Sequence, residues 1–150
     1  MSERSKGEFR SSLLLVFLMY VIVTSVCWGW LGDALLGIGS ILAWGVGDAF
    51  AAVIGKRFGK HQIKAKHIEG KKSLEGTLAM FAFSFLSVFA VLLIRGGLPI
   101  YVYCLVAIPT AIVSATIELF SMKGTDTIFC PLGAMASLIA LLYLFGGIVV

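Results

Sequence analysis

Five long apolar runs constrain this chain more than any other feature. Each holds about 20 mostly uncharged residues, the length that a helix needs to cross the hydrocarbon core of a bilayer. Hydrophobic residues make up 59% of the 150 residues and charged residues 13%, whereas soluble domains average about 45–50% and about 25%. The sequence therefore predicts an all-α, polytopic membrane protein with about five transmembrane helices, at residues 13–32, 34–55, 77–94, 96–120 and 131–150.

The basic residues predict how these helices are oriented. Every Lys and Arg except Arg95 lies on one side of the predicted bilayer: in residues 1–12, in the 56–76 loop or at Lys123. Because cytoplasmic loops carry the excess of Lys and Arg, we expect a cytoplasmic N-terminus and an outward C-terminus. The prediction is a cytoplasmic flank at 1–12 and one transmembrane domain at 13–150, with cytoplasmic loops at 56–76 and 121–130. Basic clusters beside apolar runs are typical of membrane proteins, so no nucleic-acid partner is expected.

Three carboxylates are predicted to meet on this cytoplasmic side. Asp48 lies inside the second run, Glu118 lies at the end of the fourth, and Asp126 follows in the next loop. An ionisable residue at membrane depth is costly and is a functional candidate by default. Mg²⁺ typically binds one or two carboxylates together with substrate phosphates, and the nearby basic loop could neutralise phosphate oxygens. The pattern predicts phosphoryl chemistry at a magnesium site made by these three carboxylates.

A simpler interpretation remains open for part of this pattern. Glu118 is close enough to the interface to extend its carboxylate into water, and a basic loop can serve as a topology signal or a contact for anionic lipids. A stripe of small residues, Gly47, Ala51, Gly55 and Gly59, repeats every four positions beside Asp48. That spacing favours close helix packing, including packing in a homodimer, over phosphate binding.

Two segments together resemble a known family. Residues 47–61 read GDAFAAVIGKRFGKH and residues 72–77 read KSLEGT. This pair of motifs resembles the CTP-dependent lipid kinases, which include dolichol and other polyprenol kinases, phytol kinases and CTP-using diacylglycerol kinases. The phosphatidate cytidylyltransferases are related to them. The similarity extends over about residues 45–131.

The resemblance implies an enzyme that transfers the γ-phosphate of CTP to a lipid alcohol with Mg²⁺, with its active site on the cytoplasmic face. The alcohol would be a polyprenol, phytol or diacylglycerol. Asp48, Glu118 and Lys72 would be catalytic, and Asp48, Glu118 and Asp126 would hold the metal. The implied nucleotide-binding residues are Gly47, Gly55, Lys56, Arg57, Gly59, Lys60, Ser73, Glu75 and Gly76.

Two alternatives remain open at this point. One is cytidylyl transfer to a phosphorylated lipid, in which pyrophosphate leaves and a CDP-lipid forms. The other is a small transporter or helical scaffold without enzymatic activity, in which Asp48 and Glu118 relay protons or ions. Transporters commonly contain inverted repeats, and the five predicted spans do not divide into two halves.

Overall fold

The computed structural model describes residues 3–63, 72–121 and 125–148, and these residues form helices and no strand. The helices are α1 (Glu3–Thr24), which continues as a short π-helix η1 (Ser25–Trp30), then α2 (Ala34–Phe58), α3 (Leu74–Arg95), α4 (Ile100–Phe120) and α5 (Asp126–Leu144). Five helices are long and apolar enough to cross a membrane, the first of them over Leu13–Trp30. The prediction of an all-α polytopic membrane protein is confirmed.

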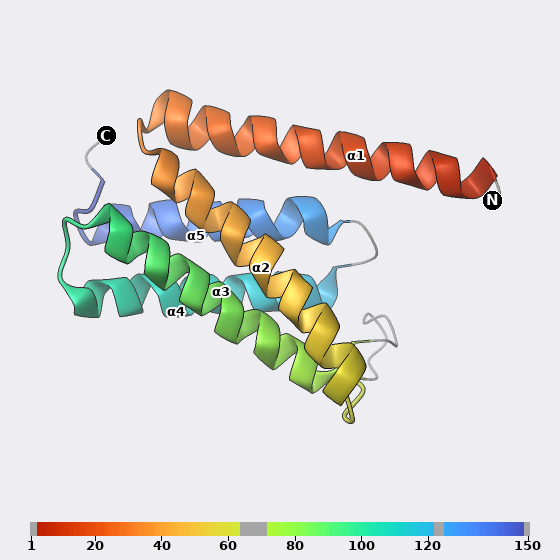
Figure 1. The fold of residues 1–150 in the computed structure, drawn as a ribbon. Coiled ribbons are helices and arrows are strands. Elements are labelled where there is room, and N and C mark those ends of the chain that lie inside the picture. Colours follow the sequence, from red (N-terminus) through yellow and green to blue (C-terminus); the bar gives the residue numbers. More distant parts are fainter. Residues whose placement is uncertain (1–2, 64–71, 122–124, 149–150) are drawn as a thin grey trace.

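Successive helices run in opposite directions across the bundle (Figure 1). Helices α2 and α3 make the most extensive contact, α4 packs on α3 and α5, and α1 packs mainly on α5. The last turns of α2 and α4 and the first turns of α3 and α5 consequently share one end of the bundle, here called the pocket end. The η1–α2 and α3–α4 connections lie at the opposite, far end (Figure 1).

Local sequence explains where several helices begin and end. The Asp33 carboxylate accepts a hydrogen bond from the Leu35 N–H, and the Ser73 hydroxyl accepts one from Gly76, so each caps a helix N-terminus. Helix α3 ends at Gly96, whose φ of 68° is the left-handed conformation that glycine adopts readily. At the far end Arg95 donates to the Asp33 carboxylate at 2.5 Å and to the Gly147 carbonyl at 2.7 Å, which joins three chain segments.

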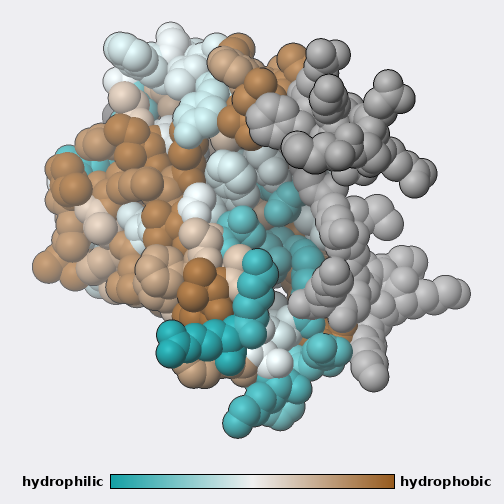
Figure 2. Space-filling model, turned by 45° about the vertical axis from the view of Figure 1, so that its right-hand side comes forward, coloured by the Kyte–Doolittle hydropathy of each residue, from teal (hydrophilic) through white to brown (hydrophobic). Residues whose placement is uncertain are grey.

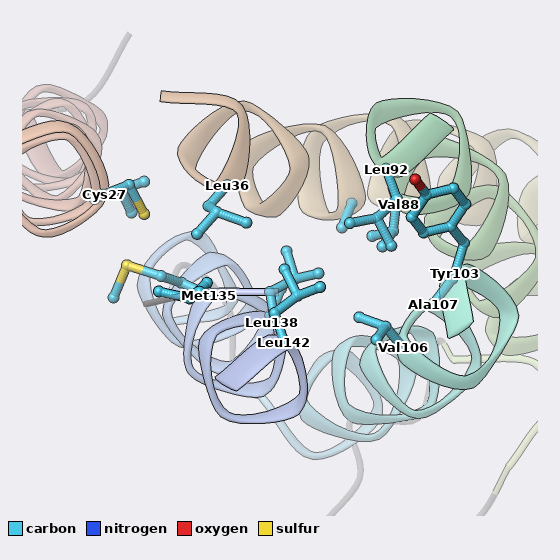
Figure 3. Packing of buried hydrophobic residues seen from close by; sticks show 14 of the residues in the cluster. Cys27, Leu36, Val88, Leu92, Tyr103, Val106, Ala107, Met135, Leu138 and Leu142 are labelled. Atoms are coloured by element: carbon cyan, nitrogen blue, oxygen red, sulfur yellow. The ribbon is translucent and has the colours of Figure 1, made fainter. Parts of the chain in front are cut away.

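The main apolar core lies nearer the far end. Figure 3 shows Leu36 of α2, Val88 and Leu92 of α3, and Leu138 and Leu142 of α5 pointing toward one another. Side chains from α4 and Cys27 of η1 complete this cluster. In a bilayer, apolar side chains are surrounded by lipid whether or not the helices associate, so the hydrophobic effect adds little to helix association. This core therefore stabilises the bundle mainly through close van der Waals packing.

Several predicted boundaries were wrong. Helix α5 begins at Asp126, five positions before the predicted start at Pro131, and it ends at Leu144. The predicted 121–130 loop is therefore helical from Asp126 onward. Pro131 lies inside the helix, where it removes one backbone hydrogen bond, and the burial of Cys130, Pro131 and Ala134 compensates for that loss. Helix α4 begins at Ile100 because Gly96 and Gly97 have positive φ angles. Helix α2 continues to Phe58, into the predicted 56–76 loop.

Candidate functional site

The stripe of small residues packs α2 against α3. A Cβ atom added at Gly47 would lie 2.5 Å from the Ser84 hydroxyl and 2.6 Å from the Met80 sulfur. At Gly55 it would lie 3.2 Å from the Ser73 hydroxyl. The packing interpretation of the stripe is thus confirmed, and α3 covers the stripe within a single chain.

A pocket of about 230 Å³ opens where α2, α3 and α4 meet at the pocket end. Its charged lining residues are Asp48 and Lys56 of α2, Lys72 just before α3, and Glu118 of α4. The remaining lining residues are small: Ala51, Ala52, Gly55, Ser73, Gly76 and Thr77. These small residues lie where α2 and the start of α3 approach each other closely, and they form one wall of the pocket. Two acidic and two lysine side chains therefore face one small space at one end of a helical membrane bundle.

Lys72 and Glu118 form an ion pair beside this space. The Lys72 ammonium lies 3.2 Å from the Glu118 carboxylate, and the two side chains are only 18% and 14% exposed. The same ammonium donates to the backbone carbonyls of Glu118 and Ser121. A cation at a helix C-terminus satisfies carbonyls that have no partner within the helix and complements the helix dipole. Lys72 therefore fixes both the Glu118 side chain and the end of α4.

Asp48 is the less constrained acid of the pocket. Its carboxylate makes no hydrogen bond or ion pair within the described part of the chain. Asp48, Glu118 and Asp126 lie close enough to influence one another electrostatically. However, Asp126 is not a lining residue of the pocket, and its carboxylate accepts a hydrogen bond from the Thr127 N–H at 3.0 Å.

The acids do not make a complete metal cage. Among the described residues there is no group of three His, Cys, Asp or Glu side chains placed to hold an ion. Mg²⁺ needs fewer protein ligands, because it binds through one or two carboxylates, several waters and substrate phosphates. Asp48 and Glu118 are carboxylates facing one space, so this donor set suits Mg²⁺ when a phosphate-bearing ligand supplies further oxygens.

Glu75 organises the turn beside the pocket. Its carboxylate accepts hydrogen bonds from the backbone N–H groups of Lys60 and His61, both at 3.2 Å, and lies 2.8 Å from the His61 ring nitrogen. An antiparallel bridge between Gln62 and Ser73 closes the same turn. Glu75 thus positions the chain on either side of residues 64–71 and does not line the pocket.

The structure separates the predicted site residues into two sets. Lining the pocket are Asp48, Gly55, Lys56, Lys72, Ser73, Gly76 and Glu118; outside its lining are Gly47, Arg57, Gly59, Lys60, Glu75 and Asp126. Lys64, Lys66, Lys71 and Lys123, which were counted in the basic loops, lie outside the described residues. The sequence analysis did not assign Ala51, Ala52 or Thr77 to the site. Their helical spacing from Asp48 and Ser73 is the signal that could have identified them.

The surface around this end differs from the rest of the molecule. Figure 2 shows hydrophilic residues gathered on one side of the molecule, while its left flank is predominantly hydrophobic. Exposed Leu, Ile and Phe side chains occur on every helix, as expected for surfaces in contact with lipid. The fold and the pocket define a class: a helical integral membrane protein with an acid-and-lysine site at one end of its bundle.

Comparison with known proteins gives two relatives of stated activity. The chain is 39% identical over 94 residues to a phytol kinase from Synechocystis sp., and 40% identical over 86 residues to the dolichol kinase sec59 of Schizosaccharomyces pombe. The alignments cover 63% and 53% of this chain. Both relatives are kinases named for lipid alcohols, so the resemblance to lipid kinases stated from the motifs is confirmed.

The matched regions are a minor part of both relatives. They span 38% of the phytol kinase and 16% of the dolichol kinase. No protein-family model matches the chain, and no solved structure matches it significantly.

Proposed function

We propose that this protein is a lipid kinase that transfers the γ-phosphate of CTP to the hydroxyl of a lipid alcohol, with its active site on the cytoplasmic face. The observation that carries the proposal is the convergence of Asp48, Lys72 and Glu118 on one pocket at an end of a membrane bundle. The similarity to a phytol kinase and a dolichol kinase supports the acceptor class. The preference for CTP rests on the motif resemblance.

The pocket is sized for the reacting groups. Pockets that enclose whole ligands usually measure about 300–1,000 Å³, and this one measures about 230 Å³. We assign it to the terminal phosphates and the acceptor hydroxyl, with the base and ribose outside it. Lys56 and Lys72 would bind phosphate oxygens, and the N-terminal turn of α3 presents its positive dipole end to the same space.

Asp48 suits the role of general base. The acceptor oxygen would form a bond to the γ-phosphorus while the bond from that phosphorus to the β-phosphate oxygen breaks. CDP leaves, and the hydroxyl proton passes to the Asp48 carboxylate. Glu118 is less available for this role because its carboxylate is already engaged in the ion pair with the Lys72 ammonium. Phosphoryl transfer otherwise depends mostly on positioning and on stabilising the charge of the phosphoryl group.

Mg²⁺ is part of the proposal, with Glu118 and one carboxylate oxygen of Asp48 as its protein ligands, so that the second Asp48 oxygen remains to accept the hydroxyl proton. The ion would neutralise charge that develops on the phosphate oxygens. Because these two carboxylates make an incomplete ligand set, binding of Mg²⁺ is expected to strengthen when the nucleotide is present.

The test uses membranes containing the protein, Mg²⁺, and CTP labelled at either the γ- or the α-phosphorus. Phytol, a polyprenol and diacylglycerol are supplied as separate acceptors. We expect label from the γ position in the lipid phase, and the labelled lipid identifies the acceptor. An equal reaction with γ-labelled ATP would remove the CTP preference from the proposal.

Two other results would contradict the proposal. Label from the α position in the lipid phase would mean cytidylyl transfer. No transfer from either position, by correctly inserted protein, would favour a role without phosphoryl transfer.

A further inference from the structure

Two buried polar groups lie on the helices that carry the pocket acids. Among the described residues, the only buried side-chain nitrogen or oxygen atoms without a hydrogen-bond partner are the Trp44 Nε1 and the Ser114 hydroxyl oxygen. Ser114 is completely buried. A buried polar group that makes no hydrogen bond costs about 1–3 kcal/mol, so these two groups need an explanation.

Helix geometry relates both groups to the pocket acids. Trp44 lies four residues before Asp48 on α2, and Ser114 lies four residues before Glu118 on α4, so each shares a helix face with one of the pocket acids. Both are one turn deeper in the bundle than those acids. Both residues also border one small cluster, made by Ala51, Met80, Ala115 and Cys130: Trp44 packs against this cluster, and its Cys130 thiol contacts the Ser114 carbonyl.

The chemistry of these groups suits a single hydroxyl group. An alcohol oxygen both accepts and donates hydrogen bonds, and each of the two unpartnered groups lies one helical turn, about 5.4 Å along the helix axis, from a pocket acid. An alcohol oxygen could therefore accept from the Trp44 N–H and donate its proton to Asp48, one turn nearer the pocket end. Ser114 could bond the same oxygen from the α4 side.

We propose that Trp44 and Ser114 bind the acceptor hydroxyl of a long-chain alcohol and hold it against the Asp48 carboxylate. This inference rests on the proposed function and adds the acceptor subsite to it. The subsite lies on the membrane side of the carboxylates, so the alcohol enters from the bilayer while the charged phosphates enter from water. The two substrates then meet at Asp48 from opposite directions.

The first test measures binding without turnover. The indole N–H resonances of ¹⁵N-labelled protein in detergent are recorded with phytol and with phytane, the saturated hydrocarbon that lacks the hydroxyl. Trp44→Phe assigns the Trp44 resonance. Trp28 and Trp30, which are 70% and 76% exposed near the far end, serve as internal references. We expect the Trp44 N–H to shift downfield with phytol and to stay unchanged with phytane.

The second test is kinetic. Ser114→Ala should raise the KM for phytol about 3- to 10-fold, the usual effect of one hydrogen bond, and leave the KM for CTP unchanged. Ser40→Ala is the matched control, because Ser40 is equally buried but already donates to the Gly37 carbonyl. It should change neither constant.

The outcomes separate this inference from the proposed function. A Trp44 shift that is the same with phytane, or no shift at all, overturns the hydroxyl subsite even if the protein is an active kinase. A shift specific to phytol in a protein that transfers no phosphate keeps the subsite and overturns the kinase proposal.

Discussion

At the scale of single residues, the pocket gives its two acids different roles. Glu118 is held by Lys72, both through its carboxylate and through its backbone carbonyl, whereas Asp48 makes no such contact within the described chain. The sequence placed both acids at membrane depth and grouped them together. It did not indicate which one is paired, because Lys72 lies 46 positions before Glu118 and only the packing of α3 on α4 brings them together.

Asp48→Asn should abolish phosphoryl transfer, with a loss of about 10²- to 10⁴-fold, the usual contribution of a general base. The amide has the same shape but cannot accept the proton. The measurement is the rate of γ-label transfer, normalised to the amount of inserted protein. Asp33→Asn is the matched control, because Asp33 binds Arg95 at the far end and should keep its transfer rate. Full activity of Asp48→Asn would remove Asp48 from the reaction.

Lys72→Met should destabilise the protein by about 3 kcal/mol, because it leaves the Glu118 carboxylate largely buried without its cation. The double variant Lys72→Met/Glu118→Gln should recover much of that stability, since no unpaired charge remains. It should still be inactive. Thermal unfolding in detergent together with the transfer assay measures both effects. Additive losses of stability would mean that the pair is not coupled.

At the scale of elements, the contact between α2 and α3 builds the pocket. Small residues on α2 let the two backbones approach closely, and the Ser84 hydroxyl of α3 donates to the Ala43 carbonyl of α2 at 2.7 Å. Two of the predicted site residues have structural roles at this contact and beside it. Gly47 packs on α3, and Glu75 holds the Lys60–His61 turn.

Gly47→Ala should destabilise the protein by about 1–3 kcal/mol, because the new methyl group would collide with Met80 and Ser84. Gly45→Ala is a strict control two residues away, where an added Cβ meets no atom within 4 Å. That variant should be neutral or more stable by up to about 1 kcal/mol, as alanine favours the helix. Thermal unfolding in detergent distinguishes them, and equal effects of the two variants would refute the packing role of Gly47.

At the scale of the whole molecule, alternating helix directions bring the ends of α2 and α4 and the starts of α3 and α5 to one side. The basic residues of the described chain gather there, with Lys56, Arg57, Lys60 and Lys72 at the pocket end and Arg95 at the far end. The Arg95–Asp33 pair closes the far end, so the open pocket lies on the side with the greater positive charge. This distribution is the basis for the predicted orientation.

If the N-terminus is cytoplasmic, His61→Cys should react with a membrane-impermeant maleimide only from the cytoplasmic side. Pro99→Cys, in the α3–α4 connection, should react only from the opposite side. Labelling of the unsubstituted chain measures the background from its own cysteines, of which Cys27 and Cys130 are buried. Labelling of right-side-out and inside-out vesicles makes the comparison, and the reverse pattern would invert the topology.

The sequence by itself determined the number of helices, the membrane class and the candidate acids. It could do so because length, apolar character and intramembrane charge are local properties, and a bilayer leaves few other structures available. Helix ends were less predictable: Pro131 suggested a start that tertiary packing places at Asp126. Only the tertiary structure decided which residues meet. The Lys72–Glu118 pair and the turn held by Glu75 each join residues distant in sequence, and helix packing sets those contacts.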